Sequence, residues 1–277
     1  MALHTKAESD PICSNDCFVG LLDVCDFDEG YASHLSEEER GQYADLPNQA
    51  RRNEWLAGRL SAKYLFLNRL EMSRAIARRP GRPALSKLTL EKLGAYSPWM
   101  YQSVEVLAND GMPTFVWCGK SRPESVSLSH AGGVSCAAIG VGAPTAVDIE
   151  TSVPRNEAFY RYNFSQAERD WATGKSGGES TASNWLFTFL WTLKESALKL
   201  GVLDQASLWS LPRIEIAGLY GLNDIEPLCR GRTMDGDFVM FTTSVKYHRR
   251  EIQVRVAVTG TRGVVLTVMN PLIGASN

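Results

Sequence analysis

Two acidic residues separated by one position stand at the end of an apolar segment. Asp148 and Glu150 follow Ala146 and Val147, and alternate residues of a strand point to the same face. Two carboxylates on one face repel each other unless a cation or hydrogen-bond donors lie between them. A hard divalent cation such as Mg²⁺ prefers such oxygen ligands. The pair is compatible with a metal site, although a strand end in solvent is the simpler interpretation of the tripeptide alone.

A second charged group lies on a segment with helical periodicity, residues 185–200. Glu195 and Lys199 are four residues apart and are therefore neighbours on a helix surface. They could supply a third carboxylate and a phosphate partner. Taken alone, they are more simply a surface ion pair worth about 0.3–0.5 kcal/mol.

A histidine precedes two glycines in Ser129-His130-Ala131-Gly132-Gly133. Small residues there let a ligand approach the backbone, and exposed amides of such a turn can meet phosphate oxygens. The sequence contains no Gly-x-x-x-x-Gly-Lys-Ser/Thr and no Gly-x-Gly-x-x-Gly pattern. A P-loop or Rossmann nucleotide site is therefore not supported.

Charge is unevenly distributed along the first third of the chain. Residues 1–50 contain two basic and eleven acidic residues, whereas residues 51–88 contain ten basic and two acidic ones. The basic segment could receive phosphate groups or an acidic partner, or it could be a helix face neutralised by the acidic segment. The net charge of −2 argues against nucleic-acid binding.

The chain carries no pattern for export or membrane insertion. No run of 18 or more apolar residues predicts a membrane span, and residues 1–10 lack the apolar core of a secretory signal. The six cysteines show no metal-site spacing, so we expect free thiols and a cytoplasmic location.

Two helix starts share one pattern and predict an internal duplication. Capping boxes are expected at Ser36 with Glu39 and at Ser165 with Glu168. On the longer helix after each, a Trp-x3-charged-x3-Lys pattern recurs: Trp55, Arg59 and Lys63, then Trp191, Glu195 and Lys199.

Strand-like segments follow each helical region. They are residues 104–108 and 114–117 (a hairpin), 126–128, 136–141, 145–149, 213–216, 238–246, 252–258 and 264–268. Residues 78–85 read as a loop. We therefore predict an α+β fold of two pseudo-duplicated subdomains, each a small, mostly antiparallel sheet packed with helices. The boundary is expected where Gly and Pro cluster, giving subdomains 1–142 and 143–277.

Taken in order, three segments closely resemble the Sfp-type 4′-phosphopantetheinyl transferases. They are S-H-A-G-G at 129–133, A-V-D-I-E at 146–150 and W-T-L-K-E-S-A-L-K-L-G at 191–201. The resemblance extends from about residue 35 to residue 258. It also accounts for the duplication, because members of that family have two similar halves with the active site between them.

The resemblance implies an enzyme that transfers phosphopantetheine from coenzyme A to a serine of an acyl, peptidyl or aryl carrier protein and releases 3′,5′-ADP. It assigns Asp148, Glu150 and Glu195 to Mg²⁺. It places His130 and Lys199 at the phosphates, with Ser129 and Lys194 beside them in the same motifs. The region that holds the 3′-phosphate of coenzyme A corresponds to the basic helix with Arg51, Arg52, Arg59 and Lys63.

The family also has a Gly-basic-Pro motif ahead of its Ser-His motif. Gly81-Arg82-Pro83 has the right residues but lies too far from His130, so we assign the motif to Gly111, Met112 and Pro113. Met112 then replaces a basic residue, which puts one phosphate contact in doubt. Ala146 stands where the family usually has glycine.

These expectations describe a monomeric, cytoplasmic, Mg²⁺-dependent transferase with holo-carrier-protein synthase activity, serving polyketide or nonribosomal peptide synthesis. Either Glu150 or Glu195 could be the general base, and Arg155 and Arg161 could steer an acidic carrier protein. A non-catalytic protein that binds coenzyme A or a carrier is the alternative. A Mg²⁺-dependent nucleotide hydrolase would explain the carboxylates but not the Lys-Glu-Ser helix. No nucleic acid or membrane partner is expected.

Overall fold

The structure, a computed structural model, describes residues 16–24, 29–72, 84–109, 112–201, 208–219, 239–248, 250–261 and 264–272. The helices are η2 (Glu29–His34), α1 (Glu37–Ala44), α2 (Gln49–Met72), α3 (Leu90–Leu93), α4 (Pro98–Gln102), α5 (Glu157–Asn163), α6 (Gln166–Ser176), α7 (Ser180–Lys199) and η3 (Leu208–Arg213). Within these ranges, none of the helices combines the length and apolar character needed to cross a bilayer.

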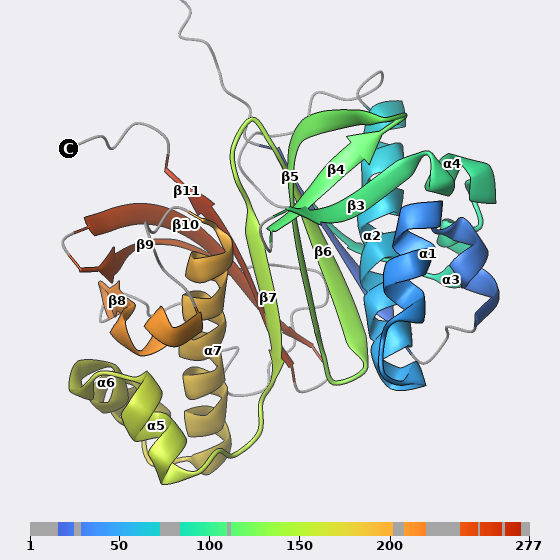
Figure 1. The fold of residues 1–277 in the computed structure, drawn as a ribbon. Coiled ribbons are helices and arrows are strands. Elements are labelled where there is room, and N and C mark those ends of the chain that lie inside the picture. Colours follow the sequence, from blue (N-terminus) through green and yellow to red (C-terminus); the bar gives the residue numbers. More distant parts are fainter. Residues whose placement is uncertain are drawn as a thin grey trace, which may run out of the picture.

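Two sheets face each other (Figure 1). The first has the order β2-β1-β6-β5-β4-β3, and its strands are β1 (Asp16–Asp23), β2 (Ala84–Lys87), β3 (Val104–Asn109), β4 (Met112–Trp117), β5 (Lys120–Ala131) and β6 (Val134–Val141). The second has the order β7-β11-β10-β9-β8, and its strands are β7 (Ala146–Thr151), β8 (Glu215–Ala217), β9 (Val239–Tyr247), β10 (Arg250–Thr261) and β11 (Val264–Pro271).

Alternation along the strands creates the layers. In β6, Ala137 and Ile139 face the helix α2, whereas Cys136 and Ala138 face the second sheet. Similarly, Val265 in β11 packs toward α7 while its neighbours pack toward the first sheet. The order of layers is therefore α2, first sheet, second sheet, α7.

The topology confirms the predicted α+β fold with two similar halves. Strands β1, β6, β5, β4 and β3 of the first sheet recur in the same order as β7, β11, β10, β9 and β8 of the second. Both predicted capping boxes, at Ser36 and Ser165, are present. The chain passes from one sheet to the other at residues 142–145, where we placed the boundary. The division into subdomains 1–142 and 143–277 stays a prediction.

The first sheet contains two strands that the sequence analysis did not predict. Strand β1 lies inside the sheet, between β2 and β6, and β2 pairs with it in parallel. Because β2 begins at Ala84, the expected loop at 78–85 was wrong at its end; residues 78–83 lie outside the described part. Four residues without alternation gave no strand pattern.

Each half contains an equivalent buried ion pair between a lysine and a glutamate. Lys63 on α2 binds Glu39 at the start of α1, and both side chains are fully buried. Lys63 Nζ also donates to the carbonyl oxygen of Tyr101 at 3.1 Å, while Glu39 accepts the Val106 N–H at 3.0 Å. The pair thus joins the start of α1, the middle of α2 and strand β3. Burial lowers the pKa of Lys63, and the Glu39 carboxylate opposes this shift.

The second half repeats this arrangement with different residues. Lys194 Nζ on α7 lies 2.9 Å from Glu168 at the start of α6, and it donates to the carbonyl oxygen of Asn163 at 2.7 Å. Glu168 accepts the Ile216 N–H of β8 at 3.2 Å. Lys63 therefore corresponds to Lys194. The sequence-based match of Lys63 with Lys199 was wrong, because it aligned residue types without knowing which lysine is buried.

Serines of β5 join the two sheets. Ser125, Ser127 and Ser129 accept the backbone N–H groups of residues 145, 147 and 149 at 3.0, 3.0 and 3.4 Å, respectively. These N–H groups lie along β7 and just before it, on the side where no strand of the second sheet pairs with it within the described ranges. We call this row of contacts the serine ladder. It satisfies a sheet edge that would otherwise expose unpaired backbone groups.

The buried ion pair gives a test of the fold. Lys63→Met should lower the free energy of unfolding by about 3–5 kcal/mol, because it leaves the Glu39 carboxylate buried without its cation. Urea unfolding at pH 7, followed by circular dichroism, measures this loss. The exposed Lys120→Met should change the free energy by less than about 0.5 kcal/mol. Equal unfolding midpoints for the two variants would contradict the structural role.

Candidate active site

The structure brings the predicted site residues of both halves together at the end of the serine ladder. Lys199 Nζ on α7 lies 2.6 Å from Asp148 Oδ1 on β7. Ser129 Oγ on β5 donates to the same oxygen at 2.8 Å. Asp148 is only 5% exposed. This carboxylate is therefore the meeting point of β5, β7 and α7.

The carboxyl groups at this point influence one another. Burial raises the pKa of Asp148, and the adjacent Lys199 and Ser129 oppose the increase. Burial also raises the pKa of Glu195, and the neighbouring Asp148 and Glu150 carboxylates raise it further against the effect of Lys199. A protonated or cation-bound state is thus favoured at Glu195 compared with a free glutamate.

The carboxylate oxygens of this site suit a hard cation. In the structure, Asp148 and Glu150 are paired with basic side chains. Glu150 Oε1 accepts the Thr151 N–H at 2.7 Å and lies 3.3 Å from a terminal nitrogen of Arg155. Asp148 is paired with Lys199. No group of three acidic, histidine or cysteine side chains among the described residues is already arranged as a metal cage. Three mutually repelling carboxylates nevertheless have the chemistry that Mg²⁺ requires, and their role as ligands stays a prediction.

A cavity of about 180 Å³ lies between α2 and β5, next to Asp148. Arg51, Arg59, Ser129 and His130 are among its lining residues. Two buried polar atoms at this cavity, Arg59 Nε and Ser135 Oγ, have no hydrogen-bond partner among the described residues. Such atoms have a desolvation cost that a bound anion could relieve.

The guanidinium of Arg59 is held over an aromatic ring. Its central carbon lies 3.6 Å from the centroid of the Trp55 ring, a cation–π arrangement. Burial lowers the pKa of Arg59 to about 10, so the side chain stays cationic at neutral pH.

Glu54 is a residue of this cavity that the sequence analysis missed. Its Oε2 lies 3.1 Å from His130 Nε2 and 3.4 Å from Arg51. Arg51 also contacts His130 directly. Burial lowers the pKa of His130, and Glu54 opposes this shift. Arg51 and Glu54 are three residues apart on a helix, and this spacing predicts a contact between them. Their contact with His130 crosses from α2 to β5, and the spacing does not predict it.

Residues 144–219 match the model of the 4′-phosphopantetheinyl transferase superfamily. This match supports a transferase of 4′-phosphopantetheine. The matched region includes β7 and α7, and with them Asp148, Glu150, Glu195 and Lys199. A comparison with curated proteins found no match to the chain. The cavity residues of α2 and β5 lie outside the matched region, so their roles rest on geometry and on the resemblance.

Two lysines predicted to bind coenzyme A are buried in ion pairs. The side chains of Lys63 and Lys194 are both fully buried, and their ammonium groups are bound to Glu39 and Glu168. Burial of both ammonium groups argues against a phosphate contact at either lysine. Arg52 is not among the residues that line the cavity: it donates to the carbonyl oxygen of Ala44 at 3.1 Å.

The predicted Gly-Met-Pro motif begins a strand next to the site. Gly111 lies outside the described residues, and Met112 and Pro113 start β4. Met112 is 47% exposed and lies against Gly201, which follows α7 and has a φ of 68°. A Cβ built at Gly201 would approach Met112 Cε to 3.1 Å. The hairpin thus reaches the end of α7 close to Lys199, with a thioether in place of a cation.

The raised pKa of Glu195 has a consequence for stability. A carboxyl whose folded pKa exceeds its unfolded value of about 4.3 makes the folded state less stable once the pH exceeds that unfolded value. Glu195→Gln should therefore raise the melting temperature at pH 7, by an amount that corresponds to about 0.5–2 kcal/mol. The gain should vanish below about pH 4, where Glu195 is protonated in both states. Thermal melts from pH 3 to 8 test this, with the exposed Glu91→Gln as the control that shows no gain.

Proposed function

We propose that this protein transfers 4′-phosphopantetheine from coenzyme A to a serine of a carrier protein, in a Mg²⁺-dependent reaction that releases 3′,5′-ADP. The observation that carries the proposal is the convergence of Ser129, Asp148 and Lys199 from three elements, two of which lie in the region that matches the transferase superfamily. Assignment to the Sfp type is part of the proposal, supported by the order of the three motifs.

The carboxylates would hold the cation. Asp148, Glu150 and Glu195 supply oxygen ligands, and Mg²⁺ bound there would withdraw charge from the pyrophosphate and fix its geometry. Lys199 remains beside Asp148, where its ammonium group can contact a phosphate oxygen. Glu195 is the better candidate for the general base, because burial and the neighbouring carboxylates raise its pKa, which favours proton acceptance.

These groups account for each bond and proton in the proposed transfer. The serine oxygen of the carrier forms a bond to the β-phosphorus of coenzyme A, and the bond from that phosphorus to the bridging oxygen breaks. The serine proton passes to the Glu195 carboxylate, and 3′,5′-ADP leaves with the bridging oxygen. His130 and Lys199 stabilise the negative charge that develops on the phosphates.

The cavity beside α2 would receive a phosphate of coenzyme A. Arg51 and Arg59 supply positive charge there, and the unpartnered Ser135 Oγ supplies a hydroxyl group. Arg51 is the more accessible of the two guanidinium groups. Arg52 and Lys63 of the same helix have other partners and take no part.

We further propose a cytoplasmic monomer that serves polyketide or nonribosomal peptide carriers. Both halves of the site come from one chain, so no second subunit is needed to complete it. Arg155 lies just before the N-cap of α5 and Arg161 lies within that helix, where they could attract an acidic carrier surface.

Mass spectrometry of an apo carrier protein tests the activity. Incubation with this protein, coenzyme A and Mg²⁺ should add the mass of one phosphopantetheine, and EDTA should prevent the addition. Glu195→Gln should reduce the rate by at least about 100-fold, the usual contribution of a general base, whereas Glu91→Gln should retain it. If no carrier of the fatty-acid, polyketide or peptide class is modified while coenzyme A still binds, the protein is a binding protein instead.

The cavity is tested by coenzyme A affinity. Arg51→Gln should weaken binding roughly tenfold or more, because it removes a charge-assisted hydrogen bond to a phosphate. Arg52→Gln removes the same charge from the neighbouring position and should change the affinity less than about twofold. Isothermal titration calorimetry at constant salt compares the two. An equal loss in both variants would show that only the net charge of the helix matters.

A further inference from the structure

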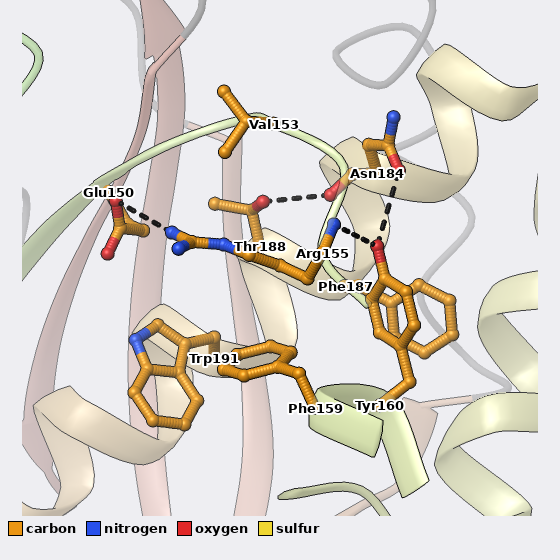
Figure 2. Close-up of a pocket in the computed structure, with 9 residues that line it drawn as sticks. All are labelled: Glu150, Val153, Arg155, Phe159, Tyr160, Asn184, Phe187, Thr188 and Trp191. Carbon is orange, nitrogen blue, oxygen red and sulfur yellow. Dashed lines mark hydrogen bonds and ion pairs between the residues drawn. The ribbon is translucent and has the colours of Figure 1, made fainter. Parts of the chain in front are cut away.

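Arg155 occupies a pocket between α5 and α7 that opens toward Glu150. Figure 2 shows its side chain extending across the pocket, with the rings of Phe159 and Trp191 below it in this view. Its guanidinium lies 3.3 Å from Glu150 Oε1 and 5.6 Å from the centroid of the Phe159 ring. This arginine therefore has two partners, a carboxylate and an aromatic face.

The backbone of Arg155 is fixed independently of its side chain. Its N–H donates to the Tyr160 hydroxyl at 2.9 Å, and that hydroxyl lies 3.4 Å from Asn184 Oδ1 on α7 (Figure 2). Arg155 directly precedes Asn156, the N-cap of α5. The guanidinium can thus move while the start of α5 stays in place.

The contact with Glu150 is weak enough to be exchanged. The side chain of Arg155 is 39% exposed and that of Glu150 is 28% exposed. Ion pairs of this exposure shift an equilibrium by no more than about fivefold. The contact with Phe159 is also a loose one, because the central guanidinium carbon lies 5.6 Å from the ring centroid.

We propose that Arg155 is an internal counter-ion that competes with the divalent cation for Glu150. The inference rests on the proposed function, in which Glu150 is a cation ligand. Oxygen Oε1 already accepts the Thr151 N–H and lies 3.3 Å from the Arg155 guanidinium, so a cation bound at this oxygen would lie directly against the guanidinium. Because both competitors are positive, they exclude each other by repulsion as well as by occupancy.

The exchange also uncovers the pocket. With the guanidinium displaced, the rings of Phe159, Tyr160, Phe187 and Trp191 line an open space beside the metal ligands. Cation binding would therefore precede access to this aromatic surface.

The experiment measures Mn²⁺ binding to the full chain by the loss of the free-ion signal in electron paramagnetic resonance, without coenzyme A. Arg155→Gln should bind Mn²⁺ about two- to fivefold more tightly than the unaltered protein. Arg161→Gln removes the same charge from α5 and should stay within about 1.5-fold. Asp148→Asn should lose binding, which identifies the site that is measured.

The outcomes separate the inference from the proposed function. Equal affinities of Arg155→Gln and the unaltered protein, with binding lost in Asp148→Asn, would overturn the competition and leave the cation site intact. Equal tightening in Arg155→Gln and Arg161→Gln would also overturn it, because net charge would then explain both. No Mn²⁺ binding in any variant would overturn the inference together with the metal part of the proposed function. Circular dichroism checks that Arg155→Gln keeps α5, since glutamine retains the backbone N–H that binds Tyr160.

Discussion

The site depends on the serine ladder. Among the described strands of its sheet, β7 pairs with β11 alone, and serine hydroxyls of β5 satisfy the N–H groups on its other side. This arrangement sets the register of one sheet against the other, because the three serines bind residues 145, 147 and 149 in turn. The last serine, Ser129, continues to the carboxylate of Asp148. The contacts that join the halves therefore also place His130, the next residue of β5, beside the carboxylates of the second half.

The two halves share a scaffold but not their chemistry. Each long helix is anchored by one buried lysine, Lys63 in α2 and Lys194 in α7, to the glutamate of a capping box. With these lysines aligned, Glu195 and Lys199 correspond to Tyr64 and Asn68, which are neutral and supply neither a carboxylate nor an ammonium group. The same fold thus presents carboxylates from one half and a basic cavity from the other. Each half needs the other, since neither contains both sets of groups.

Sequence reasoning predicted what depends on local spacing. The capping boxes, the hairpin ahead of β5 and the alternation of Asp148 and Glu150 all follow from periodicity. Burial does not follow from residue type, so Lys63 and Lys194 were taken for ligands of a phosphate although each neutralises a buried glutamate. The contact of Glu54 with His130 and the pairing of Arg155 with Glu150 join residues of different elements. A single sequence does not specify such contacts. Strand β2 is short and pairs with a strand distant in sequence, so nothing local indicated it.

The short connection between the halves affects how the interface between them can be built. Only residues 142–145 separate β6 from β7, so each half meets its partner at the high effective concentration of a tethered pair. An interface between separate subunits must bury enough apolar surface to overcome the loss of translational freedom. A tethered interface has a smaller cost to overcome and can devote part of its area to hydroxyl and charged groups. The polar edge beside Asp148 can therefore persist in the interface because both halves lie on one chain.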